Sequence, residues 1–162
     1  MKERLSDILK QSVRSGLENV HTAIPGEVVE FDAAEAKARI RPLVRRKLAN
    51  GDIQPLADVY EVPVLYPSSG DSVVSWPLLV GDSGILIFAE RNIDAWLQRG
   101  GVQDPPSKRR FDLTDGMFVP GLWSFNEAPE VLPDAMLLQY KGSRIEMMDD
   151  KVVINGNLEV DS

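Results

Sequence analysis

Apolar residues recur every four positions near the start of the chain, which predicts an amphipathic helix over residues 1–18. Leu5, Leu9, Val13 and Leu17 form the apolar row, while basic and amide side chains take the opposite face. Such a helix either packs on the domain that follows or makes a contact with another copy or another protein. The sequence alone leaves both interpretations open.

From residue 23 the hydrophobic period changes to that of strands. Residues 26–32 and 36–41 are predicted to pair as a hairpin, because the link between them has hairpin length. In the second of these strands Ala36, Ala38 and Ile40 are expected to face inward and Lys37, Arg39 and Arg41 outward.

Three more strands are predicted further along, followed by one short helix. The strands cover residues 62–66, 72–78 and 85–89, and the helix covers residues 93–97. Prolines at positions 63 and 77 place their strands at edges or bulges, because proline cannot donate to the ladder. The run at 85–89 is almost wholly apolar, which predicts burial on both faces. Five short strands, one short helix and a long connection are typical of a small five-stranded barrel of the OB type.

The last part of the chain has a different pattern. Short alternating stretches begin at Met136 and are broken by turn residues, too few to enclose a core within one chain. The sequence therefore predicts a mainly β protein in four parts: a helix (1–18), an OB-fold domain (19–126), a linker (127–135) and an intertwined trimeric β-helix or β-prism stalk (136–162). The residues expected in the trimer core of the stalk are Ile145, Met147, Val152, Ile154, Leu158 and Val160.

The amino-acid composition disfavours several classes of binding and catalytic site. Eighteen basic residues against 25 acidic ones give a net charge of −7, which disfavours a general binder of nucleic acid or of acidic membranes. Cysteine is absent and His21 is the single histidine, so most metal sites and nucleophilic triads lack their residues. The first residues lack the apolar stretch of a signal peptide, and apolar runs are far too short for a membrane span. No cofactor and no bound metal are expected.

An enzymatic activity is not expected either. No Gly-x-Ser-x-Gly elbow occurs, and the paired acidic residues are typical of solvated strands and turns. A glycoside hydrolase would need two carboxylates across a cleft, and no stretch is long enough for an inserted domain that would form one.

A stripe of six positive charges at residues 37–47 leaves an alternative open. On an OB fold such a stripe favours single-stranded nucleic acid, with aromatic side chains as stacking platforms. However, no aromatic residue lies between Phe31 and Tyr60, so the stacking rings are missing from the stripe. A solvated or protein-docking face is the simpler interpretation.

The order of these parts resembles the central spike of contractile phage tails, the baseplate assembly protein V group. The resemblance covers nearly the whole chain and rests on the combination of segments rather than on one motif. The matching segments are the leader helix, Pro25–Asp32, Val62–Pro67, Pro77–Phe88, Phe111–Gly116 with Pro120–Leu122, and the repeats Gly142–Glu146 and Asn155–Val160.

The resemblance implies a homotrimeric, non-enzymatic spike of the tail baseplate, assembled in the host cytoplasm and located in the virion. It implies that the row Leu5, Leu9, Val13 and Leu17 docks on hub or other baseplate proteins, and that the stalk pierces the host outer membrane. Members of the group often bind iron at the apex through three His-x-His pairs. With only His21 this chain cannot form that site, so the tip is a separate protein or the chain was cut before it.

Overall fold

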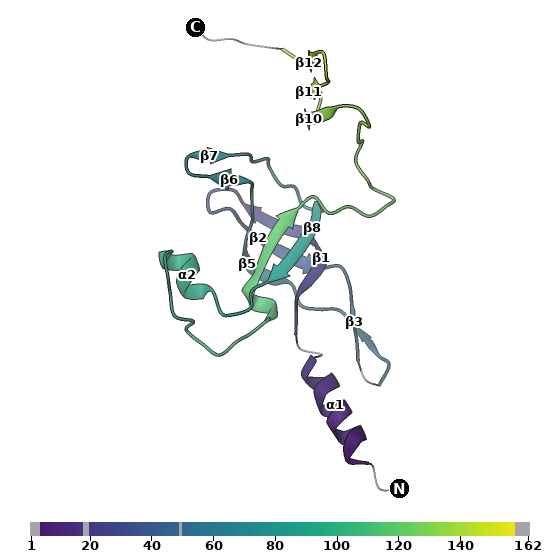
Figure 1. The fold of residues 1–162 in the computed structure, drawn as a ribbon, viewed down its shortest axis with the longest axis vertical. Helices are drawn as coiled ribbons and strands as arrows, with labels where there is room; N and C mark the ends of the chain where they lie inside the picture. The colour runs from purple at the N-terminus through teal and green to yellow at the C-terminus, as the bar shows by residue number, and fades with distance from the viewer. Residues whose placement is uncertain (1–3, 18–19, 49, 158–162) are drawn as a thin grey trace. The chain divides into compact units, whose positions relative to one another are not determined.

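The computed structural model describes residues 4–17, 20–48 and 50–157, and the chain divides into two compact units. The first extends to Leu122 and the second begins at Trp123. Figure 1 labels the helices and most of the strands of both. Each unit is described by itself.

The first element is helix α1 (Leu5–Leu17), which contains no buried residue. Asp7 lies in its first turn and Arg14 in its last turn, where each charge favours the helix dipole. The predicted helix is therefore present over the described residues, and its apolar row contacts no core.

The centre of the first unit is a curled antiparallel sheet in the order β5-β2-β1-β8-β9. An isolated parallel bridge joins Val64 to Phe118, and the Leu65 amide donates to the Phe118 carbonyl at 2.8 Å. The segment that follows β5 thereby contacts β9 at one isolated bridge, and the curled sheet forms a half-barrel. Its strands are β1 (Ala23–Asp32), β2 (Lys37–Pro42), β5 (Val59–Pro63), β8 (Ser83–Phe88) and β9 (Gly116–Pro120).

The concave side of this sheet holds the core. Ile40, Leu86 and Phe118 are wholly buried, and Val28 and Val62 almost so. Burying each of these side chains stabilises the fold by roughly 1.5–3 kcal/mol. The predicted hairpin and the inward positions Ala38 and Ile40 are confirmed. The predicted inward position of Ala36 is wrong, because this residue lies half-buried in the turn before β2 with a φ of 51°.

Two glycines lie opposite each other beneath this core. Gly26 pairs with Gly84 across β1 and β8. A Cβ at Gly26 would lie 2.6 Å from Ile40, and one at Gly84 would lie 2.5 Å from the Phe118 ring. The absence of both side chains gives the two larger residues their space.

The predicted burial of β8 on both faces is wrong. Gly84, Leu86 and Phe88 are buried, but Ile85 is half-buried and Ile87 remains 37% exposed. An apolar run predicts burial of every position, but the half-barrel covers only its concave side.

Two small hairpins extend from the sheet: β3 (Arg46–Lys47) with β4 (Ile53–Gln54), and β6 (Ser68–Ser69) with β7 (Ser72–Val73). The predicted strand at 72–78 is thus wrong beyond Val73. Pro77 has no N–H to donate, and the Trp76 carbonyl accepts a hydrogen bond from the Tyr66 hydroxyl instead of from a neighbouring strand.

The connection from β8 to β9 contains helix α2 (Asp94–Arg99) and the 3-10 turn η1 (Leu113–Asp115). The Asp115 side chain is wholly buried and accepts hydrogen bonds from the Arg109 guanidinium. Arg109 also contacts Asp94 at 2.8 Å, so one arginine fastens α2 to the turn that precedes β9. Hydrogen bonding to Asp115 raises the pKa of Arg109 further above its usual value.

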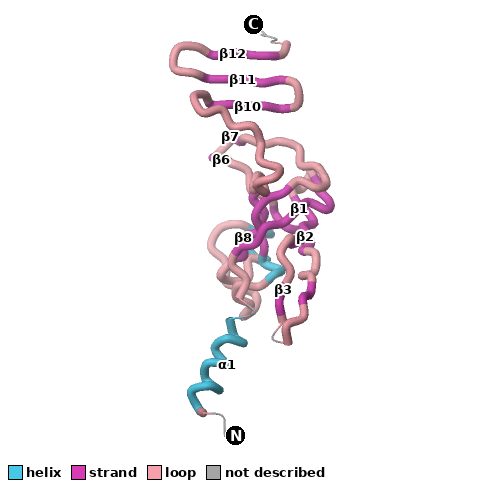
Figure 2. Tube along the Cα trace, turned by 90° about the vertical axis from the view of Figure 1, so that its right-hand side faces the viewer, coloured by secondary structure: helices cyan, strands magenta, loops and turns pink. Residues whose placement is uncertain are grey.

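The second unit contains a three-stranded antiparallel meander, with β11 in the middle. Figure 2 shows the three strands following one another in chain order. The strands are β10 (Met136–Tyr140), β11 (Ser143–Met147) and β12 (Val152–Asn155).

The predicted fold class is confirmed for its coarse features: a mainly β chain with an N-terminal helix and a curled sheet. The single chain shows a meander rather than the predicted intertwined stalk. Among the described residues, no helix is long and apolar enough to cross a membrane.

Candidate assembly interface

One face of the β10–β12 meander consists almost wholly of apolar side chains. Cross-strand pairing sets Leu138 opposite Ile145 and Ile145 opposite Ile154, which aligns the three residues across the sheet. A second row runs from Met136 through Met147 to Val152. Neighbouring side chains in such rows lie close enough to contact one another.

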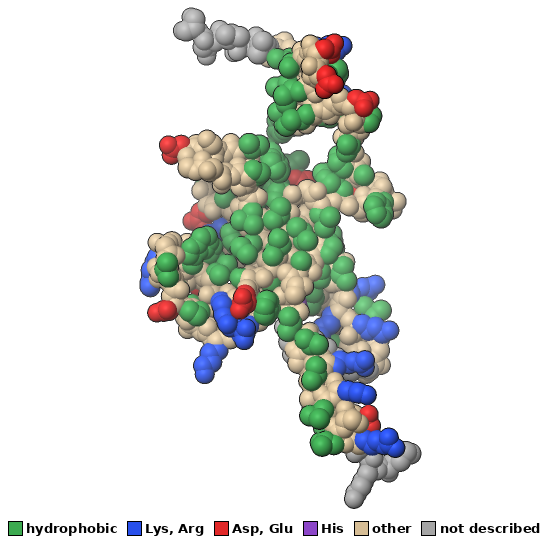
Figure 3. Space-filling view, viewed as in Figure 1, with side chains coloured by type: hydrophobic (Ala, Val, Ile, Leu, Met, Phe, Trp, Pro, Cys, Tyr) green, Lys and Arg blue, Asp and Glu red, His purple; other side chains and the backbone are tan. Residues whose placement is uncertain are grey.

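This face is open in the single chain. Val152 is 60% exposed, Met136 59% and Leu138 48%. No residue of the second unit is buried over the part that the structure describes, 123–157. The meander thus has an apolar face without a core, and Figure 3 shows green side chains gathered on one side of it.

The opposite face is polar and partly covered by the same chain. The Arg144 guanidinium contacts Glu146 at 2.6 Å on its own strand and Glu130 at 3.8 Å in the preceding segment. The pairing register places Arg144, Glu146 and Val153 on this side of the sheet. The two faces therefore differ in chemistry, and only the apolar one lacks charges.

Four of the predicted stalk-core residues, Ile145, Met147, Val152 and Ile154, share the apolar face. Leu158 and Val160 lie outside the described residues. Three further members were missed: Met136, Leu138 and Tyr140 of β10, which alternate over 136–140 in the sequence. That alternation could have identified them.

The predicted hub-docking row is also exposed. Leu5 is 72% exposed, Leu17 64%, Val13 63% and Leu9 57%. Spacing on α1 sets the four residues along one side of the helix. The helix therefore presents an apolar stripe that no other part of the described chain covers.

Three of the six basic residues at 37–47, those on β2, pair with acidic side chains. Arg41 contacts Glu27 at 2.9 Å, Arg39 contacts Glu30 at 3.6 Å, and Lys37 contacts Glu35 at 2.7 Å. A hydrogen bond to Glu35 raises the pKa of Lys37. These pairs compete with phosphate for the same cations, which disfavours the nucleic-acid interpretation.

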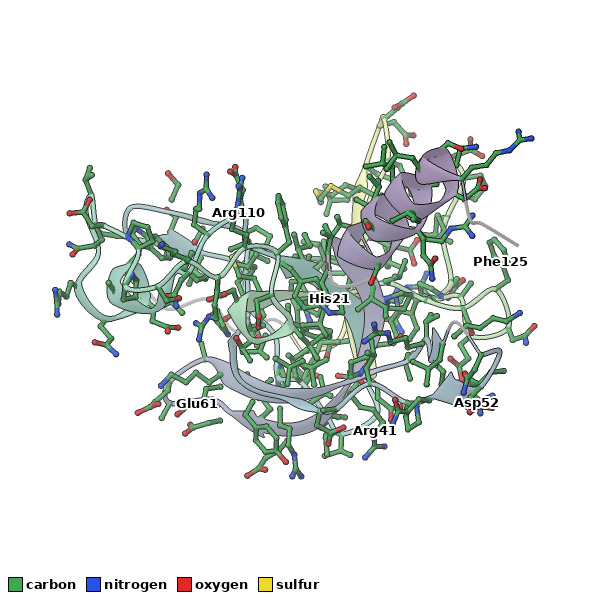
Figure 4. All side chains as sticks on the ribbon, turned by 90° about the horizontal axis from the view of Figure 1, so that it is seen from below. His21, Arg41, Asp52, Glu61, Arg110 and Phe125 are labelled. Atoms are coloured by element: carbon green, nitrogen blue, oxygen red, sulfur yellow. The ribbon has the colours of Figure 1, made fainter. Side chains whose placement is uncertain are left out.

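Arg41 lies on the outer side of the curled strands (Figure 4), as the alternation predicts. His21 lies beside the aromatic core: its ring centroid is 5.5 Å from that of Phe88, and its backbone N–H donates to the Phe111 carbonyl. No group of three His, Asp or Glu side chains suited to a metal occurs within the described residues.

Comparison with known proteins identifies the first unit. Residues 24–121 match the family model of the phage protein Gp138 N-terminal domain. The chain belongs to this family. No curated protein matches the chain.

Membership supports a structural, virion-associated role in a phage. The matched region begins within β1 and ends just after β9, so it coincides with the half-barrel and its loops. The β10–β12 meander lies beyond the match, and its interpretation rests on its own geometry.

Proposed function

We propose that the chain is a homotrimeric central spike of a phage baseplate or related contractile injection device. The observation that carries the proposal is the meander with an almost wholly apolar face and, over residues 123–157, no buried residue. An apolar face left in water contributes no burial free energy, and a contiguous exposed apolar surface marks an interaction site.

Three copies of the meander provide the cover. If three apolar faces meet around a common axis, every copy gains a core and each contact is repeated three times by symmetry. Burial of each Ile or Val is worth roughly 1.5–3 kcal/mol. Pairing between copies also removes exposed strand edges, which makes a narrow column rigid.

The first unit supplies the collar in this proposal. Its five-strand order and the parallel bridge between Val64 and Phe118 support an OB-type barrel. The exposed row of α1 supports docking on hub or baseplate proteins, because an apolar helix face of this kind fits a groove on a partner.

The action of the spike is mechanical and involves no catalytic step. Contraction of the sheath drives the tube, and the stalk transmits the force to the host outer membrane. The sequence contains one histidine, so it lacks the His-x-His pair of an apical iron site. If the spike consists of this sequence alone, a separate protein forms its tip.

Sedimentation of the purified full chain tests the assembly. The expected mass is three times the 18.0 kDa of one chain. A monomer at micromolar concentration would remove the basis of the proposal. Immunogold labelling of phage particles tests the location: the label is expected at the distal end of the tail, and labelling of the head would contradict the spike.

A further inference from the structure

The outer face of the half-barrel carries an apolar patch of six residues over three strands. Cross-strand pairing aligns Pro25, Ile85 and Val119 in one row. The second row contains Ala23, Ile87 and Met117. We call these six residues the outer patch. All of them are half-buried or exposed in the single chain, and Ile87 is 37% exposed.

The same outer face carries charged side chains where β1 pairs with β2. There Glu27 pairs with Arg41 and Glu30 pairs with Arg39, each across β1 and β2. In antiparallel sheets with one solvated face, apolar side chains usually point inward and polar ones outward, as they do in this half. The outer patch departs from that rule, and contiguous exposed apolar surfaces mark interaction sites.

Figure 3 shows this part of the surface. Green side chains gather over the region where β8 and β9 face the viewer in Figure 1, and blue and red side chains lie mainly around it.

A second copy of this chain is the occupant that the molecule itself provides. Thirteen residues, 123–135, join the half-barrel region to the meander and span at most roughly 45 Å. If the meanders associate, the tether holds the first units at an effective concentration in the millimolar range. A weak apolar contact is then sufficient.

The net charge of the first unit and a second exposed apolar surface both allow such a contact. Residues 1–122 contain 15 basic and 17 acidic residues, so copies of the first unit repel one another little. A ring of copies requires two different complementary surfaces on each chain. The end of β7 and the loop after it offer the second: Val73, Val74, Trp76, Leu79 and Val80 are all at least 40% exposed.

We propose that the outer patch packs against the first unit of a neighbouring copy. The inference rests on the trimer proposed above and adds a second interface to it, separate from the meander.

The absence of native cysteine allows a direct test on the full chain. Ile87→Cys places a thiol in the patch, and Glu30→Cys places one on the charged half of the same face. Each thiol is titrated with a coloured disulfide reagent in the otherwise native chain and again with Ile154→Asp added. Val119→Cys repeats the measurement if Ile87→Cys fails to fold.

In the trimer the thiol at position 87 is expected to react about tenfold more slowly than in the dissociated Ile154→Asp chain, because a packed interface excludes the reagent. The thiol at position 30 is expected to react equally in both. The purified protein contains no other partner, so the protection would come from a second copy.

Other results separate the two proposals. Equal reactivity of the position-87 thiol in an intact trimer and in the monomer overturns the outer-patch inference and leaves the spike standing. Protection that persists in a monomer also overturns it, since the chain itself would then cover the patch. A native chain that is monomeric removes both proposals. A trimer that survives Ile154→Asp with the position-87 thiol protected supports the outer patch and refutes the role of the meander.

Discussion

The two units use similar short antiparallel strands and differ in where their apolar side chains find cover. In the first unit five strands curl until β5 and β9 meet, and Ile40, Leu86 and Phe118 are buried within one chain. In the second unit three strands stay open, and Ile145 and Ile154 remain more than a third exposed. Strand number and closure therefore decide whether a β-unit completes its core alone.

The stabilities of the two units are expected to respond differently to protein concentration. The first unit is expected to unfold as an autonomous core whose stability depends little on protein concentration. The stability of the second unit is expected to depend on protein concentration, because association supplies its core in the proposed trimer.

The largest effect is expected from Ile154→Asp in the second unit. In the proposed trimer, the substitution would bury three unpaired carboxylates where three apolar faces meet, which such a core cannot compensate. We expect the trimer to dissociate to monomers in sedimentation experiments. Asn155→Asp is the matched control, because it adds the same charge on the other face of the same strand. An intact Ile154→Asp trimer would locate the interface elsewhere.

Phe118→Ala should break the first unit instead. Truncation of this wholly buried side chain is expected to cost about 3–5 kcal/mol in the free energy of unfolding. Urea unfolding followed by tryptophan fluorescence measures the loss, and sedimentation of the folded fraction should still report a trimer. A variant that loses its trimer while the first unit stays folded would contradict the division into two cores.

Arg109→Gln tests how much of the first unit depends on one polar contact. The substitution leaves the buried Asp115 carboxylate without its charged donor, at a cost of about 1.5–3 kcal/mol. Arg110→Gln is the control, because its pair with Glu90 is exposed at 3.5 Å and worth at most about 1 kcal/mol. Urea midpoints of the two variants should differ accordingly. Equal midpoints would show that the buried pair contributes no more than the surface pair.

The smallest effect is expected at the cap of η1. The Thr114 backbone N–H donates to Asp112 and lowers the pKa of its carboxyl below the ordinary 3.8. Asp112→Ala should therefore cost about 1 kcal/mol near neutral pH. Because the folded-state pKa is lowered, the contribution is complete above the ordinary value and is lost as the pH falls through the lower one. Chemical unfolding near pH 7 and below pH 3 should show the difference between the two proteins shrinking in acid.

The sequence predicts elements more reliably than it predicts what covers them. The alternation over 37–41 correctly assigned the faces of β2, because its three charged residues favour the solvent side. It was wrong for Ala36, which lies in the turn before the strand. The run at 85–89 correctly located a strand, but Ile87 is on its open side, since periodicity cannot tell whether a second layer exists. Beyond Val73 the predicted strand failed because hydrogen bonding of Trp76 to a distant tyrosine is not a local property.

The same holds for the candidate interface: the sequence predicts its strands better than it predicts which surfaces are covered. Alternation in the tail identified Ile145 and Ile154 as members of one face. Met136 and Leu138 alternate in the same way, but only the pairing register places them on the same face as Ile145. Nothing local in the sequence marks the outer patch as uncovered, since Ile85 and Val119 resemble core residues.

The facing glycines of β1 and β8 have an evolutionary consequence. Gly84 leaves room for the Phe118 ring, and Gly26 leaves room for Ile40. Each glycine and its filling residue form one volume, so neither can change alone without overpacking or a cavity. Across the family, a larger residue at the position of Gly26 should coincide with a smaller one at that of Ile40. The position of Gly84 should stay glycine, because a Cβ there would also lie 2.4 Å from the Val119 carbonyl oxygen.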